Sequence, residues 1–267
     1  MNSTITRTIS GAIYVLIFII ATLYSPYSFL LLIGIFLLFS VIEFSKLIHI
    51  KPIFPILIAG LGYIAFNLNS TIKTNDILLL IAALFVSIKS LLFLFDSKGK
   101  HLDITSKYVF LIGYLIIPMI LFTKIPFVNN QYYPKIIISI LTIIWTNDTF
   151  AFLTGKTFGK NKLFEKVSPK KTIEGLLGGV FFSIISGIIL AITYTHENIF
   201  RWISIALIVS LFGTLGDLVE SKFKRIASVK DSGNIMPGHG GFLDRLDSII
   251  FASPFVYLFY QILYYVS

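Results

Sequence analysis

The chain has 267 residues, of which 56% are hydrophobic and only 13% charged, a balance that excludes an ordinary soluble domain and indicates an integral membrane protein. The net charge is +9, but the basic residues fall between apolar segments, so we expect anionic lipids and phosphate-bearing substrates as partners, and no nucleic acid. The absence of cysteine excludes disulfides, thiolate metal sites and cysteine nucleophiles.

Nine apolar stretches are of spanning or near-spanning length, since a helix needs roughly 17 to 25 residues to cross a bilayer. They predict an all-α, polytopic membrane protein with one domain over residues 1–267, in which residues 1–133 form a scaffold and residues 134–267 carry catalytic helices and loops. The first stretch is expected to be a retained helix, because no small-residue cleavage site follows it. The stretches cover about residues 9–24, 27–47, 52–67, 77–95, 108–124, 134–155, 173–194, 202–219 and 249–266. The first and third are short.

Most of the 22 Lys and Arg residues fall in alternate connecting segments, together with the N-terminal segment. Because cytoplasmic segments carry the excess of Lys and Arg, this pattern predicts an N-terminus inside and a C-terminus outside. The segments assigned to the outside contain only Lys73, Lys124, Lys135 and Arg201.

The first four or five stretches contain little that suggests chemistry. Glu43 lies near the inner end of the second stretch. We interpret it as an interfacial acid paired with Lys46 rather than as a catalytic group.

The sixth stretch carries a carboxylate, Asp148, at membrane depth within an Ile-rich run. An ionisable group there costs at least ~2.5 kcal/mol to insert, so it normally faces a partner or a watery cavity. We therefore expect Asp148 to be functional. In the predicted topology it converges on one side of the membrane with Glu174, Asp217 and Asp244.

The segment after Asp148 is basic and ends at the start of the seventh stretch. Gly155-Lys156-Thr157 is not part of a P-loop, because the first glycine of that motif would be residue 150, which is Phe. A hydroxyl, two amines and a carboxylate then precede a predicted helix, whose N-terminus favours bound phosphate. These residues are Ser168, Lys170, Lys171, Thr172 and Glu174. A capped helix start with a positive-inside loop is the alternative.

Polar residues recur at three and four positions apart where the eighth stretch ends, at Asp217, Glu220, Ser221 and Lys224. If the helix continues, they lie along one face and point into a polar cleft. A structural salt-bridge stripe is the alternative.

The segment 221–248 is polar in an otherwise apolar chain and surrounds a Pro-Gly-His-Gly-Gly turn. Asp244 and Asp247 are three residues apart, so in a helix their carboxylates share a face and repel each other unless a cation lies between them. Hard oxygen ligands of this kind suit Mg²⁺. A solvated loop before a helix is the alternative.

The string from Ser221 to Asp247 closely resembles the signature of the phosphatidate cytidylyltransferases, or CDP-diacylglycerol synthases. The resemblance rests on Ser221, Phe223, Lys224, Arg225, Lys230, Asp231, Gly233, Pro237, His239, Gly240, Gly241, Phe242, Asp244, Arg245, Leu246 and Asp247. Met236 stands where the family usually has Leu, Ile or Phe. Residues 148–175 also resemble the family, with Asp-Thr-x-Ala-aromatic and Ser-Pro-x-Lys-Thr-x-Glu-Gly, although Phe150 and Phe152 replace its usual Gly or Tyr.

The resemblance implies transfer of CMP from CTP to phosphatidic acid, giving CDP-diacylglycerol and pyrophosphate, with Mg²⁺ as cofactor and a second metal ion left open. It also implies a homodimer in the cell membrane with its active site facing the cytoplasm. The catalytic candidates are Asp217, Lys224, Arg225, Asp231, His239, Asp244 and Asp247. The substrate-binding candidates are Ser168, Lys170, Lys171, Thr172, Glu174, Ser221, Lys230 and Arg245. The metal candidates are Asp148, Asp217, Asp244 and Asp247. His239 either acts on phosphate or a proton, or is structural.

Two other functions fit parts of the sequence. An ion-coupled membrane transporter also carries intramembrane acids, but its substrate groups should lie near the bilayer midplane. Another metal-dependent lipid phosphotransferase is the nearer enzyme alternative, although the paired Asp-x-x-Asp arrangement usual in CDP-alcohol phosphatidyltransferases is missing.

Overall fold

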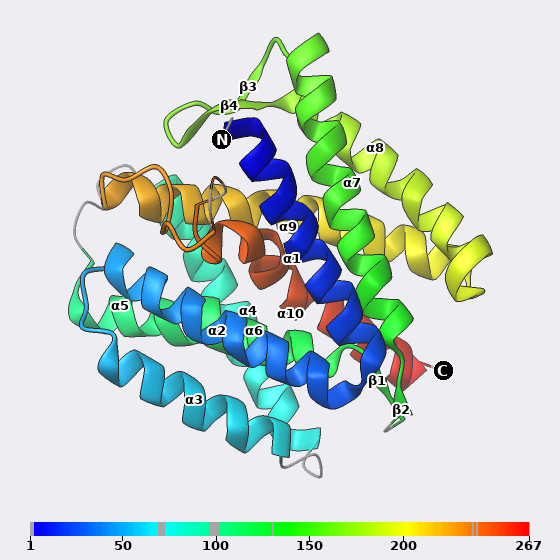
Figure 1. The fold of residues 1–267 in the computed structure, drawn as a ribbon, viewed down its shortest axis with the longest axis horizontal. Coiled ribbons are helices and arrows are strands. Elements are labelled where there is room, and N and C mark those ends of the chain that lie inside the picture. The colour runs from blue at the N-terminus through cyan, green and yellow to red at the C-terminus, as the bar shows by residue number, and fades with distance from the viewer. Residues whose placement is uncertain are drawn as a thin grey trace.

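Helices dominate the computed structural model, which describes residues 3–68, 73–96, 102–129, 131–236, 238 and 240–266. A helix lies at each of the nine predicted stretches (Figure 1). The helices are α1 (Ser3–Tyr24), α2 (Pro26–Leu47), α3 (Ile53–Leu68), α4 (Lys73–Phe95), α5 (Ile104–Phe110) continued by the π-helical η1 (Leu111–Ile116) and by α6 (Ile117–Lys124), α7 (Pro134–Phe158), α8 (Ile173–Leu190) continued by η2 (Ala191–Thr195), α9 (Ile199–Ile226) and α10 (Leu243–Val266).

Seven helical spans in the described part of the chain are long and apolar enough to cross a membrane, while α1 and α3 contain shorter apolar helices. These two match the first and third predicted stretches, which are also the short ones. The all-α, multi-pass membrane architecture is therefore confirmed. The orientation of the termini stays a prediction.

Two short antiparallel hairpins, absent from the prediction, connect the long helices. The first joins β1 (Phe127–Val128) to β2 (Gln131–Tyr132), and the second joins β3 (Lys162–Phe164) to β4 (Ser168–Thr172). The β3–β4 hairpin projects beyond the ends of α7 and α8 (Figure 1). At its end, the Thr172 hydroxyl accepts a hydrogen bond from the Gly175 amide at 3.1 Å and caps α8. The capped helix start considered above is therefore present.

Glycines let α7 and α8 approach closely, as small residues do between membrane helices. A Cβ on Gly179 would lie 2.6 Å from the Asn147 side-chain oxygen and 3.1 Å from the Ala151 Cβ. On α3, by contrast, a Cβ on Gly60 would meet nothing within 4 Å.

We expect Gly179→Ala to destabilise the protein by about 1–3 kcal/mol, because the added methyl overpacks the α7–α8 contact. The matched change Gly60→Ala should instead stabilise it by up to about 1 kcal/mol, because alanine is the better helix former and nothing is displaced. Denaturant unfolding of the two purified variants in detergent measures both. Equal effects of the two changes would contradict the close packing.

The C-terminal end of α9 is anchored in an aromatic cluster. The Phe223 ring is buried, with centroids 5.0 Å from Phe44, 4.8 Å from Phe93 and 5.2 Å from Phe110. These rings come from α2, α4 and α5, so helices of the N-terminal half hold the polar segment of α9 in place. Dispersion and apolar burial thereby fix the position of the charged groups on its other faces.

Candidate active site

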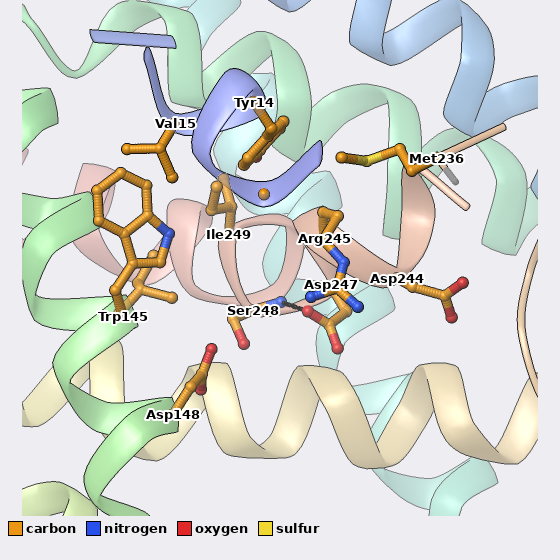
Figure 2. Close-up of a pocket in the computed structure, with 12 residues that line it drawn as sticks. Tyr14, Val15, Trp145, Asp148, Met236, Asp244, Arg245, Asp247, Ser248 and Ile249 are labelled. Atoms are coloured by element: carbon orange, nitrogen blue, oxygen red, sulfur yellow. Dashed lines mark hydrogen bonds between the residues drawn. The ribbon is translucent and has the colours of Figure 1, made fainter. Parts of the chain in front are cut away.

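A cavity of about 230 Å³ lies where α1, α7 and α10 meet. Figure 2 shows Asp148 and Trp145 of α7 on one side, Asp247 and Arg245 of α10 on another, and Tyr14 of α1 above them. Apolar side chains complete the wall, so the cavity combines carboxylates, a guanidinium and hydrocarbon. Three carboxylates against one guanidinium leave the lining with a net negative charge, so an anionic ligand would need a cation beside it.

Two carboxylates that line this cavity, Asp148 and Asp247, interact with a third on α9, Asp217. The negative charge of Asp217 on α9 repels those of Asp148 on α7 and Asp247 on α10, and Asp148 and Asp247 also repel each other. Two of these carboxylates also accept a hydrogen bond from a neighbouring residue. Asp247 Oδ1 accepts from the Ser248 amide at 2.7 Å, and Asp148 Oδ1 accepts from Asn147 Nδ2 at 3.5 Å. The predicted convergence of Asp148 and Asp217 is thus present, and Asp247 joins them.

Lys171 connects the β3–β4 hairpin to this acidic group. Its ammonium lies 2.5 Å from Asp217 Oδ2, and the Ser221 hydroxyl donates to Asp217 Oδ1 at 3.1 Å. Both side chains of the ion pair are partly exposed. The pair therefore lies at the open edge of the site, where an incoming anion can compete with the carboxylate for the ammonium.

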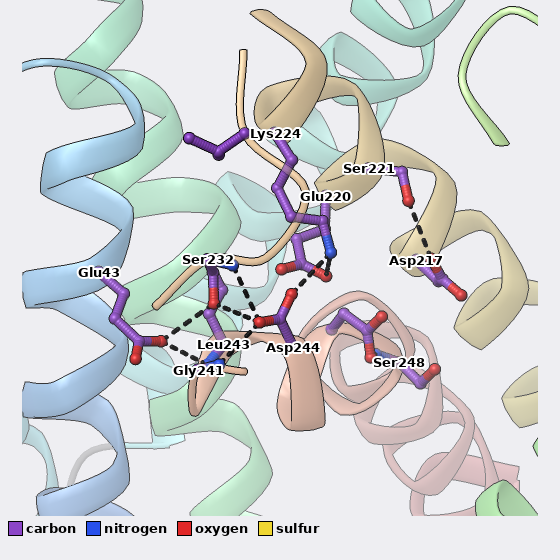
Figure 3. A network of polar contacts seen from close by, with 12 residues as sticks. Glu43, Asp217, Glu220, Ser221, Lys224, Ser232, Gly241, Leu243, Asp244 and Ser248 are labelled. Carbon is purple, nitrogen blue, oxygen red and sulfur yellow. Dashed lines mark hydrogen bonds and ion pairs between the residues drawn. The ribbon is translucent and has the colours of Figure 1, made fainter. Parts of the chain in front are cut away.

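A second group of charges is centred on Lys224 (Figure 3). Its ammonium lies 2.7 Å from Asp244 Oδ1 and 3.2 Å from Glu220 Oε2. Glu220 is fully buried, and its negative charge is offset by Lys224 one helical turn away. The predicted polar stripe on α9 exists, and its Glu220–Lys224 part is the salt bridge that was the alternative interpretation.

Both carboxylate oxygens of Asp244 accept hydrogen bonds from the protein. Its Oδ2 accepts from the Ser232 amide and hydroxyl, both at 2.9 Å, and from the Gly241 amide at 2.8 Å. The cation expected near Asp244 and Asp247 is, within the protein itself, Lys224, whose charge acts on both. Among the contacts of Asp244 with described residues, Oδ2 accepts three hydrogen bonds and Oδ1 accepts one, so Oδ1 has the more open lone pair for a further ligand.

Other predicted site residues serve the backbone. Arg225 Nε donates to the Val167 carbonyl at 3.3 Å. The Glu174 carboxylate accepts from the amides of Lys160 and Asn161 and so closes the hairpin. Their assigned roles towards substrate stay predictions.

Most of the remaining predicted residues lie on the surface of the protein. Lys170, Lys230 and Asp231 are exposed, and Ser168 begins β4. Arg245 is exposed and lines the cavity. His239 lies outside the described residues.

Lys222, two residues before Lys224 in the chain, is directed away from the site. It is buried and donates to the backbone carbonyls of Phe93, Leu94 and Asp96, at the end of α4. A lysine at that place satisfies carbonyls that have no partner within the helix.

The interpretation of Glu43 is wrong. Instead of facing Lys46 at the interface, Glu43 is buried and accepts hydrogen bonds from the segment before α10 (Figure 3). Helix α1 was likewise expected to contribute little, yet its residue Tyr14 lines the cavity. No local signal marks either contribution, because both depend on residues far apart in the sequence.

The carboxylate oxygens of the site are suitable ligands for a hard cation, but the described side chains do not lie close enough together to form a metal site. Carboxylate oxygens are the ligands that Mg²⁺ prefers, and Asp148, Asp217 and Asp247 retain free lone pairs. In the described part of the chain, however, no three acidic or histidine side chains are close enough together to hold a metal ion. Lys171 instead neutralises part of the acidic charge.

Comparisons with known proteins show which sequences the chain resembles. A profile of the cytidylyltransferase family matches residues 5–263. A phosphatidate cytidylyltransferase of Staphylococcus aureus is 54% identical over 115 residues, and enzymes of the same name from Staphylococcus epidermidis and Staphylococcus saprophyticus are 49% identical over 113 and 114 residues. Each alignment covers 42% of this chain and 44% of the relative, which is less than half of either protein.

Proposed function

The chain belongs to the cytidylyltransferase family, and on that basis we propose that it transfers the cytidylyl group of CTP to phosphatidic acid, giving CDP-diacylglycerol and pyrophosphate. One observation carries this proposal: a cavity among membrane helices brings Asp148, Asp244 and Asp247 together with Arg245, while Lys224 pairs with Asp244 and the charge of Lys171 acts on Asp148 and Asp247. Neither the transporter nor another lipid phosphotransferase is favoured by the family match.

The reaction requires no covalent intermediate on the protein. An oxygen of the lipid phosphate attacks the α-phosphorus of CTP, and the bond from that phosphorus to the bridging oxygen breaks, so that pyrophosphate leaves with the electron pair. The protein therefore has to position two anions and stabilise the charge that develops on the phosphorus oxygens.

The cations of the site divide into accessible and buried groups. Lys171 and Arg245 lie at accessible positions, and we assign them to substrate phosphates, which arginine binds as a bidentate partner. Lys224 is buried between Glu220 and Asp244. Its role is to hold the carboxylates of Glu220 on α9 and Asp244 on α10 in fixed positions.

We propose that Mg²⁺ acts as cofactor and that Asp148, Asp217 and Asp247 would come closer together to hold it than they lie in this structure, while Asp244 offers only its Oδ1. The ion would neutralise phosphate charge during the displacement. The carboxylates would orient it, and Ser221 and Ser248 would fix two of those carboxylates through the hydrogen bonds described above. A cytoplasmic location of the site, where CTP is available, and a homodimer are parts of the same proposal that rest on topology and family resemblance.

The test is the conversion of phosphatidic acid by purified protein in detergent, with CTP compared against ATP, GTP and UTP. CDP-diacylglycerol should form with CTP and Mg²⁺, and its formation should stop on addition of EDTA. Product without a divalent ion would overturn the metal assignment. No product with any nucleotide and any divalent ion, from protein shown to be folded, would overturn the function itself.

A further inference from the structure

Glu43 of α2 is joined to the segment before α10 through three hydrogen bonds. Its Oε2 accepts from the Leu243 amide at 2.9 Å and from the Ser232 hydroxyl at 3.2 Å, and its Oε1 accepts from the Phe242 amide at 3.2 Å. The side chain is 1% exposed. A carboxylate buried to this degree is costly unless donors surround it, and all three donors belong to the one segment.

Glycines in this segment leave the room that the carboxylate occupies. A Cβ on Gly233 would collide with Glu43 Oε1, and a Cβ on Gly241 would collide with Glu43 Oε2 and the Ser232 hydroxyl. Gly233 has no positive φ, so its close approach to Glu43, and not its backbone conformation, opposes a side chain there. Glycine at positions 233 and 241 therefore leaves the space in which the Glu43 carboxylate lies.

The same segment carries the contacts that orient Asp244. Ser232 bridges the two acids, since its hydroxyl is 3.2 Å from Glu43 Oε2 and 2.9 Å from Asp244 Oδ2. The Gly241 amide, next to the amides that Glu43 accepts from, donates to Asp244 at 2.8 Å. Glu43 thus fixes the donors that fix Asp244, and α10 begins within this arrangement.

We propose that Glu43 is a positioning residue for the active site: from α2 it holds Ser232, Phe242 and the first residue of α10, Leu243, so that Asp244, Arg245 and Asp247 are presented to the cavity. The inference rests on the proposed function for its catalytic consequence, but not for its structural part. The effect of Glu43 on the cavity passes through Ser232 and the backbone amides of Phe242 and Leu243.

The experiment compares wild-type protein with Glu43→Gln. The glutamine side chain has nearly the same shape, but its NH₂ group replaces one of the two accepting oxygens and cannot accept a hydrogen bond from a backbone amide. Hydrogen exchange read by mass spectrometry should show the amides of residues 240–248 exchanging about tenfold faster, while those of the β3–β4 hairpin keep their wild-type rate. The rate of CDP-diacylglycerol formation should fall about tenfold, and the Mg²⁺ concentration for half-maximal rate should rise severalfold. A general loss of folded protein would lower the rate without moving that concentration.

A second pair of variants keeps the proposal testable if Glu43→Gln does not fold. Gly233→Ala should reproduce the faster exchange and the lower rate, because its methyl pushes the carboxylate away from the segment. In a Glu43→Ala background, which makes room, the same change should have no further effect. Unchanged exchange at 240–248 in Glu43→Gln and in Gly233→Ala, or faster exchange with an unchanged rate and Mg²⁺ requirement, overturns the proposal. If wild-type protein makes no product, the proposed function fails, and hydrogen exchange alone decides whether Glu43 holds the segment.

Discussion

Replacing Asp247 with Asn is expected to lower the rate of CDP-diacylglycerol formation by about 10²- to 10³-fold, the range for losing one electrostatic contact at a reacting centre. Asp247 lines the cavity together with Asp148, and the charge of Asp217 on α9 acts on both. Asn has nearly the same volume but lacks the charge, so the affinity of this group for a divalent cation should fall sharply.

The fold should not suffer in this variant. Three carboxylates repel one another at the site, and removing one charge relieves part of that repulsion. The unfolding temperature of Asp247→Asn should therefore equal or exceed that of wild type while the rate collapses. The control is Asp103→Asn, which alters an exposed acid at the N-cap of α5 and should leave the rate unchanged. An Asp247→Asn enzyme that keeps more than half of the wild-type rate would contradict the assignment.

Lys224→Met is expected to destabilise the protein by about 3–5 kcal/mol, the cost of breaking a buried ion pair from one side. Lys224 lies between the carboxylates of Glu220 and Asp244, and both of these are buried. Without the ammonium, Glu220 has no cation and Asp244 keeps only its neutral donors. Denaturant unfolding in mixed micelles measures the loss.

A second substitution distinguishes the charge from the packing. Adding Glu220→Gln to Lys224→Met should restore part of the stability, because one uncompensated charge is removed, but it should not restore activity. Lys51→Met, at an exposed position between α2 and α3, should change the stability by no more than about 0.5 kcal/mol. If Lys224→Met and Lys51→Met have equal effects, the buried network does not contribute to stability as described.

The membrane helices are predictable from the sequence because a bilayer leaves the backbone few alternatives to a helix. The length of α9 is less so. Its apolar run ends near residue 219, yet the helix continues to Ile226. Phe223 packs into an aromatic cluster and Lys222 satisfies the carbonyls at the end of α4, so tertiary contacts extend the helix into polar sequence.

The sequence predicts which residue types gather at the site, but it does not predict which side chains from distant segments contact one another. Spacing along one helix correctly places Ser221 near Asp217 and Glu220 near Lys224. The contact of Lys171 with Asp217 depends on a hairpin that has no apolar pattern. The hydrogen bonds of Glu43 join residues 189 to 200 positions apart, and no local pattern in a single sequence reports such a distance.

The transfer itself is tested most directly by following two labels of CTP in the wild-type enzyme. With phosphatidic acid and Mg²⁺, ³²P at the α-position should enter the chloroform-soluble lipid, and ³²P at the γ-position should appear in water-soluble pyrophosphate. This division follows only from attack on the α-phosphorus with pyrophosphate as the leaving group. Label from the γ-position in the lipid would indicate phosphoryl transfer, and that result would contradict the cytidylyltransferase function.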